Sequence, residues 1–268
     1  MEKKDQQEIK KTIRKTYGKI ALQEDTNESG SSSCCAPGCC SGGGDSPAQA
    51  ATVVGYETSE LESVPQASIL GVGCGAPVKF ADLQRGETVV DLGSGAGIDV
   101  FLSAKKVTVD GRVIGIDMTD EMLERARRNA KEHGYTNVEF RKGDIEQRIP
   151  VDDNTADVVI SNCVLNLTMD KVNAFKEIHR ILKHSGRMVI SDLVTDAEIA
   201  PIHADLEKWC SCIDGALTKE HYIESIRQAG FENVEVLSEQ LYTEEDDCNQ
   251  LDGKRKKKIS SVVIKAIK

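Results

Sequence analysis

Residues 88–97 read TVVDLGSGAG, a short apolar run that ends in an acidic residue and continues into three glycines. Residues 98–107 then have the apolar spacing of a helix. A strand, a glycine loop and a helix in direct succession direct the backbone N–H groups of the loop and of the first helical turn at a ligand. Gly93, Gly95 and Gly97 let the chain turn tightly around that ligand, because no Cβ stands in the way. This stretch predicts a ligand site at the end of a strand.

Strands and helices alternate after the glycine loop. Further strands are expected at 113–117, 138–142, 156–161 and 187–192, helices at 119–133, 171–183 and 218–229, and two late strands at 234–237 and 261–267. Because parallel strands need crossover helices, this alternation indicates an α/β fold, a doubly wound and mostly parallel sheet with helices on both faces. Ligands of such sheets bind beyond the carboxyl ends of the strands.

The charge and the apolar pattern exclude several classes of protein. Lys and Arg number 34 against 44 Asp and Glu, a net charge of −10. This acidity argues against nucleic acid as a partner, because such binding depends on neutralising phosphates. The sequence has no apolar run long enough for a membrane span or a secretory signal, so we expect a cytoplasmic protein without a membrane partner. Its nine cysteines need an explanation other than a disulfide scaffold.

Residues 1–50 differ from the rest of the chain and are expected to form an N-terminal segment outside the main domain, residues 51–268. Residues 3–22 carry apolar side chains at helical spacing, which predicts an amphipathic helix that docks on another surface. A solvated helix without functional consequence is the alternative.

A Cys-rich stretch follows that helix. Residues 24–50 are rich in Gly and Ser and are expected to form a mobile arm, because small residues bury too little surface to offset chain entropy. The arm carries two cysteine doublets, Cys34-Cys35 and Cys39-Cys40. These thiols suit a redox or metal-delivery role; a linker with incidental cysteines is the alternative.

A second acidic residue and the glycine spacing restrict the ligand. Asp117 ends the strand after the glycine loop, where a carboxylate accepts hydrogen bonds from both hydroxyls of a ribose. Residue 98 is Ile, so the loop reads G-x-G-x-G rather than the dinucleotide pattern G-x-G-x-x-G, and no G-K-[ST] stretch for a triphosphate is present. With Gly143-Asp144 after the third strand, these residues resemble the class I S-adenosylmethionine-dependent methyltransferases, whose fold is Rossmann-like.

This resemblance implies S-adenosylmethionine as the cofactor. In that family the glycine loop wraps the methionine portion, the acid after the second strand holds the ribose, and the acid after the third reaches the adenine amino group. The implied cofactor-binding residues are Asp91, Gly93, Ser94, Gly95, Gly97, Asp117, Met118, Asp144, Ile145 and Asn162. A doubly wound sheet without a cofactor is the alternative.

Four further cysteines lie near the expected carboxyl edge of the sheet. Cys163 follows the fourth strand, Cys74 lies in the turn-rich GVGCGAP before the first, and Cys210 and Cys212 lie in EKWCSCIDGAL after the fifth. Thiols this far apart lack the CxxC spacing of a structural zinc site. Converging thiolates suit a soft, thiophilic element instead.

A closer resemblance extends over roughly residues 53–217. In order, the chain carries motifs similar to those of microbial arsenite methyltransferases: YETSELESVPQASILGVGCGAP (56–77), DLGSGAGID (91–99), GIDMTDEML (115–123), NCVLNL (162–167) and CIDGAL (212–217). The family often has Asn-Pro after GCG. This chain has Ala76-Pro77 there, so a contact from that Asn side chain does not carry over.

The arsenite methyltransferase resemblance implies three arsenic ligands. They are Cys74, Cys163 and Cys212, carried by segments at about 64–80 and 193–217 and by the end of the fourth strand. Arsenite and methylarsenite are then the substrates. Cys210 has no clear counterpart in the family and competes with Cys212 as a ligand candidate.

The same resemblance implies a redox role for an N-terminal cysteine. Cys35 is taken as that thiol, although spacing does not separate it from Cys34, Cys39 or Cys40. It would pair with Cys74 and be reset by a thiol reductant such as thioredoxin or glutathione. Two alternatives are a methyltransferase of a small organic acceptor with core cysteines, and a non-enzymatic metalloid-binding protein.

Overall fold

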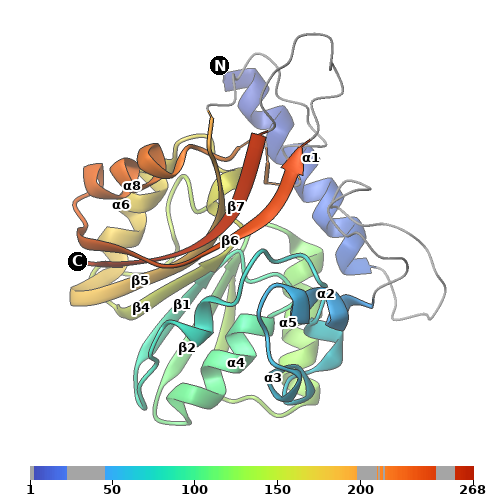
Figure 1. Ribbon diagram of the computed structural model, residues 1–268. Helices are drawn as coiled ribbons and strands as arrows, with labels where there is room; N and C mark the ends of the chain where they lie inside the picture. Colours follow the sequence, from blue (N-terminus) through green and yellow to red (C-terminus); the bar gives the residue numbers. More distant parts are fainter. Residues whose placement is uncertain (1–2, 23–45, 198–209, 211, 214, 246–256) are drawn as a thin grey trace.

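A twisted seven-stranded sheet runs through the centre of the computed structural model, which describes residues 3–22, 46–197, 210, 212–213, 215–245 and 257–268 (Figure 1). The strand order is β3-β2-β1-β4-β5-β7-β6. Its strands are β1 (Thr88–Leu92), β2 (Arg112–Asp117), β3 (Val138–Lys142), β4 (Ala156–Asn162), β5 (Leu182–Thr195), β6 (Glu232–Glu245) and β7 (Lys257–Ile267). Strands β1 to β5 pair in parallel, and β7 runs antiparallel to both of its neighbours. The predicted α/β fold class is confirmed.

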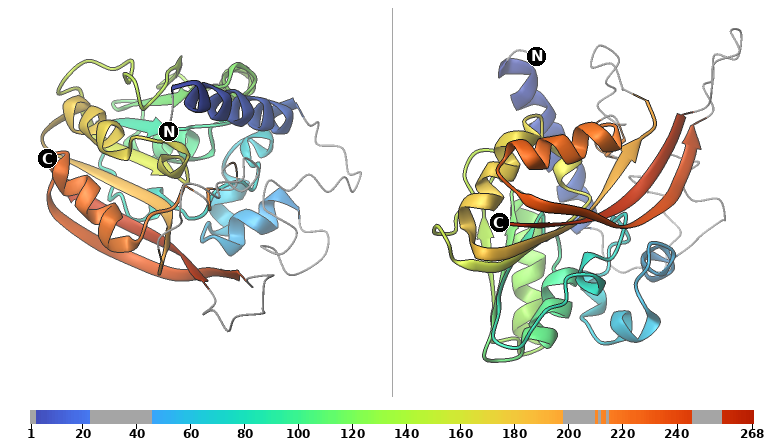
Figure 2. Two further views of the ribbon diagram at one scale, coloured as in Figure 1. Left: turned by 90° about the horizontal axis from the view of Figure 1, so that it is seen from above. Right: turned by 60° about the vertical axis from the view of Figure 1, so that its left-hand side comes forward.

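Two helical layers cover the sheet (Figures 1 and 2). On one face, α6 (Lys171–Ile181) and α8 (Lys219–Gln228) bury Phe175, Ile178 and Tyr222 in one apolar cluster with the strands. On the other face, α4 (Ile98–Val107) and α5 (Asp120–Glu132) pack Phe101 and Leu123 in a second cluster. The sheet is therefore buried on both sides, as parallel sheets require.

Shorter elements precede the first strand, together with one long helix. These are α1 (Lys3–Leu22), α2 (Pro47–Val53), α3 (Thr58–Glu62) and the 3₁₀ turns η1 (Gln66–Ser68) and η2 (Pro77–Lys79); a third turn, η3 (Leu165–Leu167), follows β4. Helix α1 is the amphipathic helix expected at 3–22. None of the described helices is long and apolar enough to cross a membrane.

Several predicted boundaries are corrected. The arm was expected to extend to residue 50, but α2 begins at Pro47, because Ser46 caps it with a reciprocal hydrogen-bond pair to Gln49. The four arm cysteines themselves lie outside the described residues. The helix predicted to end at residue 183 ends at Ile181, and the following strand starts at once. The two late strands are longer than expected, since their ends continue one antiparallel ladder.

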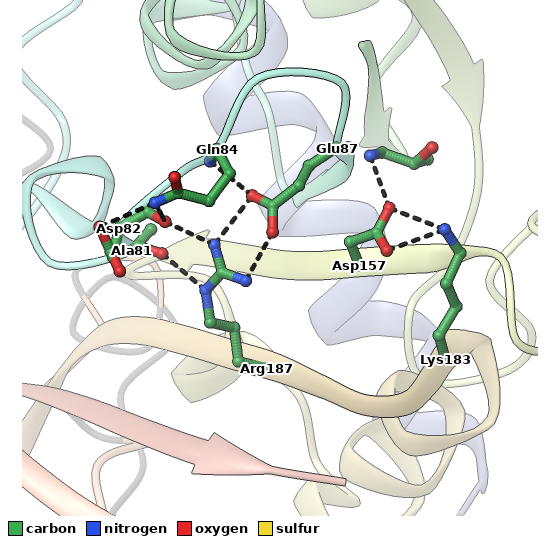
Figure 3. Close-up of polar contacts among 8 residues, drawn as sticks. Ala81, Asp82, Gln84, Glu87, Asp157, Lys183 and Arg187 are labelled. Atoms are coloured by element: carbon green, nitrogen blue, oxygen red, sulfur yellow. Dashed lines mark hydrogen bonds and ion pairs between the residues drawn. The ribbon is translucent and has the colours of Figure 1, made fainter.

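Ion pairs fasten the amino ends of the strands, opposite the edge where ligands bind (Figure 3). Arg187 of β5 forms two parallel hydrogen bonds to Glu87, at 2.7 and 2.8 Å, and its Nε donates to the carbonyl of Ala81. Lys183 pairs with Asp157 at 2.8 Å, and Asp157 accepts the backbone N–H of Thr88 at the start of β1. These contacts connect β1, β4 and β5 at their amino ends.

Candidate cofactor pocket and thiol cluster

The glycine loop after β1 folds back onto β2. The N–H groups of Gly93 and Ser94 both donate to the carbonyl of Ile116, at 2.7 and 3.0 Å. Gly93 has φ +68°, and a Cβ there would lie 2.1 Å from the side chain of Val164. Glycine is therefore required by its backbone angle and by the close approach of Val164.

The carboxylate of Asp117 is fixed against this loop. It accepts the N–H of Gly95 at 3.0 Å and the N–H of Thr119 at 2.8 Å. Burial raises the pKa of Asp117, while these backbone hydrogen bonds counteract part of the rise. The sequence placed this acid at the end of the second strand, and the structure brings it to the glycine loop.

An open cavity lies at the carboxyl ends of β1, β2 and β4. Of the residues predicted to bind cofactor, it is lined by Gly93, Gly95, Asp117, Met118, Asp144, Ile145 and Asn162. An adjoining cavity is lined by Asp91, Ser94 and again Gly93, Gly95 and Asn162. Gly97 lines neither cavity: it caps α4 with φ +100°, and a Cβ there would lie 2.8 Å from Phe101.

Helix α1 forms another wall of the larger cavity, through Lys10, Ile13 and Tyr17. Lys10 Nζ pairs with Asp144 at 2.8 Å and with Glu146 at 2.7 Å. Burial lowers the pKa of Lys10, but the hydrogen bonds to both carboxylates outweigh it and leave the pKa raised. The sequence predicted a docking helix without showing where it docks.

A buried network connects the cavities to the first cysteine segment. The Tyr56 hydroxyl donates to Asp99 at 2.9 Å, and the side-chain amide of Asn162 donates to the Tyr56 oxygen at 2.9 Å and to the carbonyl of Gly75 at 2.6 Å. The Asn162 Oδ1 accepts the backbone N–H of Cys74 at 3.1 Å. Burial raises the pKa of Asp99 to about 6, against the lowering effect of the Tyr56 hydrogen bond. Tyr56 and Asp99 were missed by sequence reasoning.

Cys74, Cys163 and Cys212 lie in one buried cluster, with Leu193 and Ile213 around them. The Cys212 thiol donates to the carbonyl oxygen of Cys163 at 2.8 Å. Hydrogen bonds with the Cys212 and Cys74 thiols, together with burial, hold the pKa of Cys163 well above its usual value. The three thiols predicted from distant segments thus meet, and Cys163 also lines the larger cavity.

Two of these cysteines have an unusual backbone. Cys163 has φ +59° and Cys212 has φ +66°, in the left-handed region that residues with a Cβ rarely adopt. Such strain costs on the order of 1–3 kcal/mol and is commonly found at functional sites. The Cys163 N–H is held by the carbonyl of Ser191 at 2.8 Å, which fixes the turn that presents the thiol.

A buried carboxyl borders the thiols. The ligand atoms of Cys74, Cys163 and Asp192 all lie within 4.8 Å of one another. Asp192 is held by the Tyr222 hydroxyl at 2.9 Å and by the N–H of Asn166 at 3.0 Å. Burial raises the pKa of Asp192 to about 6, although the Tyr222 hydrogen bond lowers it. Asp192 ends the strand expected at 187–192, in VISD, which is the sequence signal that could have marked it.

Cys210 is separated from that cluster. It is buried against Ile9 and Ile13 of α1, and its thiol donates to the Thr16 hydroxyl at 3.8 Å. The structure therefore brings Cys212, and not Cys210, to Cys74 and Cys163.

Residues 83–230 match the family described as "Methyltransferase domain". The chain belongs to this methyltransferase family. Its sheet and helices have the Rossmann-like fold of the class I S-adenosylmethionine-dependent methyltransferases, and S-adenosylmethionine is its methyl donor.

The methyltransferase is similar in sequence and structure to proteins named as arsenite or arsenic(III) methyltransferases. It is 40% identical to an arsenite methyltransferase of Halobacterium salinarum over 90% of this chain and 62% of that protein, and 36% identical to one of Aquipseudomonas alcaligenes over 66% of this chain and 52% of that protein. A solved arsenic(III) S-adenosylmethionine methyltransferase from Chlamydomonas reinhardtii superposes with a TM-score of 0.65 at 29% identity, over 84% of this chain and 74% of that one. The chain spans about half to three fifths of the length of these two curated relatives.

The walls of the cavities in this methyltransferase fit S-adenosylmethionine. The Asp117 carboxylate stands at the loop where a ribose would lie, and Met118 and Ile145 offer apolar surface for a purine ring. Among the described residues, the buried Ser94 hydroxyl has no hydrogen-bond partner, so the adjoining cavity has a polar group to offer.

Proposed function

We propose that this methyltransferase transfers the methyl group of S-adenosylmethionine to trivalent arsenic held by Cys74, Cys163 and Cys212. One observation carries the proposal: three buried thiols from widely separated segments meet at the point where Cys163 also lines the cofactor cavity. The thiols would bind arsenite and methylarsenite, since soft sulfur ligands select thiophilic elements. The similarity to arsenite methyltransferases supports the same substrate.

The residues around the glycine loop would hold the cofactor. Asp117 would accept hydrogen bonds from the ribose hydroxyls, and Asp144 would accept one from the adenine amino group. Gly93, Ser94 and Gly95, with Asp91 and Asn162 behind them, would enclose the methionine portion. S-adenosylmethionine supplies an electrophilic methyl group on a sulfonium. The protein would contribute by positioning the acceptor in line with the carbon–sulfur bond that breaks.

Arsenic binding by these thiols requires no net proton acceptor. Each thiol that replaces a hydroxyl of arsenous acid releases one water molecule, so three thiols give the tris-thiolate and three waters. Trivalent arsenic bound to three sulfurs keeps a lone pair on its open side. If that side faces the cofactor cavity, the lone pair displaces S-adenosylhomocysteine without a general base. This account needs no paired-carboxylate or His-Asp motif.

Repeated turnover would need a reductant, because giving up the lone pair raises arsenic to the pentavalent state. A thiol of the N-terminal arm would attack the arsenic-bound sulfur of Cys74, forming a disulfide and returning two electrons to arsenic with release of one proton. Cys35 is our candidate, although it lies outside the described residues. A cytoplasmic reductant such as thioredoxin or glutathione would then reduce the disulfide.

The test is to incubate reduced full-length protein with arsenite and S-adenosylmethionine and to identify products by mass spectrometry. We expect methylated arsenicals together with S-adenosylhomocysteine. Cys163→Ser should abolish both products, whereas Cys210→Ser, the matched change outside the cluster, should retain them. Failure of the reduced wild-type protein to methylate arsenic, or unchanged turnover by Cys163→Ser, contradicts the proposal.

A further inference from the structure

Helix α1 lies along α5 at the carboxyl edge of the sheet and contacts the methyltransferase domain at several points (Figures 1 and 2). Ile20 and Ala21 pack on Met122 of α5, and Arg125 of α5 donates to the carbonyl of Ala21 at 3.1 Å. Gly18 lies so close to Glu121 that a Cβ there would stand 3.2 Å from its carboxyl group. These contacts dock the carboxyl-terminal half of α1.

The amino-terminal half of α1 reaches the cofactor cavity. Lys10 contacts Asp144 and Glu146, two carboxylates that come from the loop after β3 and are 134 and 136 positions away in the chain. Their side chains are only 17% and 10% exposed, so solvent screens these pairs less than surface pairs. Lys10 thereby helps to orient Asp144, the carboxylate proposed above to accept a hydrogen bond from the adenine amino group.

The middle of the same helix reaches the third cysteine segment. The Tyr17 hydroxyl donates to the carbonyl of Cys210 at 3.1 Å, and the Cys210 thiol donates to Thr16 at 3.8 Å. The Cys210 side chain is buried between Ile9 and Ile13. Because Cys212 follows two residues later, a helix that holds Cys210 also restricts where the Cys212 thiol can lie.

We propose that α1 is a clasp that couples cofactor binding to arsenic binding, with Lys10 and Tyr17 as its two positioning residues. The inference rests on the proposed function, because the ligand of the thiol cluster is taken to be trivalent arsenic. Neither residue is assigned to the chemistry of methyl transfer. Each acts through another group, Lys10 through Asp144 and Tyr17 through the Cys210–Cys212 segment.

The coupling follows from one shared docking step. A ligand that contacts Asp144 favours the docked helix through Lys10, and a ligand that holds Cys212 in the cluster favours the same docked helix through Tyr17. The free energy needed to dock α1 is supplied by whichever ligand binds first. The second ligand therefore binds more tightly. By thermodynamic linkage, each ligand must tighten the other by the same factor.

The experiment measures binding without turnover. S-adenosylhomocysteine, which has no methyl group to transfer, is titrated into reduced full-length protein with and without saturating arsenite by isothermal titration calorimetry. We expect arsenite to tighten its binding at least about fivefold, at the lower end of usual coupling between sites. The coupling ratio is the dissociation constant of S-adenosylhomocysteine without arsenite divided by that with arsenite. In Tyr17→Phe this ratio should fall towards one. The arsenic content per chain should stay unchanged at saturating arsenite.

Lys10 is tested in the same titration with two variants. Lys10→Met should weaken S-adenosylhomocysteine binding and reduce the ratio, and Lys10→Arg should restore both. Two matched controls have the same side-chain changes elsewhere: Lys219→Met removes a surface pair with Glu239, and Tyr135→Phe alters a ring packed on Phe101. Both controls should keep the wild-type ratio.

The outcomes separate this inference from the proposed function. A ratio near one in the wild-type protein, or a wild-type ratio in both Tyr17→Phe and Lys10→Met, overturns the clasp even if arsenic is methylated. Coupling that disappears in these variants supports the clasp, even if the assay for methylated arsenicals is negative.

Discussion

The side-chain amide oxygen of Asn162 accepts the backbone N–H of Cys74 at 3.1 Å. One residue therefore lines both cavities and holds the segment of the first thiol. This hydrogen bond holds the Cys74 segment against the end of β4, and the Ser261 hydroxyl, which donates to the Cys74 carbonyl at 2.6 Å, holds it against β7. A change in the Asn162 amide should thus disturb acceptor alignment as well as stability.

Asn162→Ala should lower the free energy of unfolding by about 2 kcal/mol, because buried N–H groups of Cys74 and Gly75 lose their acceptor. The methylation rate should fall at least about tenfold, since alignment of the reacting groups is lost. Urea unfolding and single-turnover methylation measure the two effects. Asn137→Ala removes a half-buried amide that donates to Ala104 and Thr108, and should lower stability only. Equal loss of rate in both variants would contradict the alignment role.

Gly93→Ala should lower the free energy of unfolding by about 3 kcal/mol. The new Cβ is strained in the left-handed backbone conformation, and it overpacks against Val164. Binding of S-adenosylhomocysteine should be lost in parallel. Gly86→Ala is the matched control, because Gly86 also has a positive φ, +84°, but a Cβ there meets nothing within 4 Å. It should cost only about 1 kcal/mol and leave binding intact. Thermal unfolding and calorimetric titration distinguish the two contributions.

Cys212→Ser should reduce the affinity for arsenite at least about tenfold, because oxygen is a poor ligand for a thiophilic element. Cys210→Ser should bind one arsenic per chain as the wild-type protein does, since Cys210 packs on α1 and not in the thiol cluster. Equilibrium dialysis with elemental analysis measures both. The reverse result would make Cys210 the third ligand.

Asp192→Asn should flatten the dependence of stability on pH. The folded pKa of about 6 lies above the ordinary 3.8, so the folded state binds the proton more tightly than the unfolded state. Stability contributed by this proton is present below about pH 4 and is lost as pH rises through about 6, by on the order of 3 kcal/mol. The variant lacks that loss. Urea unfolding between pH 4 and pH 7 should show a shallower fall than in the wild-type protein.

Tyr222→Phe should change the same profile in the opposite direction. Its hydroxyl donates to Asp192 and lowers the pKa of that carboxyl, so removing it extends the loss of stability to higher pH. A profile identical to that of the wild-type protein would assign the pH dependence to other carboxyls.

The sequence was sufficient to predict the sheet, because apolar runs such as TVVD and VIGID alternate with helices of regular period. The sequence was less successful for element boundaries that depend on tertiary contacts. The extra length of β6 and β7 depends on their pairing with each other, and α2 begins inside a stretch that composition alone assigns to a mobile arm. Ser46 and Pro47 were the local signal for that start.

The candidate site was likewise predictable from the sequence only in part. The glycine loop and Asp117 follow from local pattern, whereas Cys74, Cys163 and Cys212 were grouped by resemblance to a family. Lys10, Tyr56 and Asp192 were missed, because their partners are remote in the chain; Lys10 and Asp144 are separated by 134 positions. The sequence around a lysine on an amphipathic helix does not indicate which carboxylate the lysine will pair with.

The Arg187–Glu87 and Lys183–Asp157 pairs close the amino ends of strands whose other ends form the site (Figure 3). A strand such as β1 separates the two ends by about 15 Å, beyond the range at which substitutions usually interact energetically. The ion pairs that stabilise the fold and the residues of the site therefore lie at opposite ends of the same sheet. Substitutions that strengthen the contacts at the amino ends of the strands can raise the stability of the protein and leave the site at the carboxyl ends unchanged.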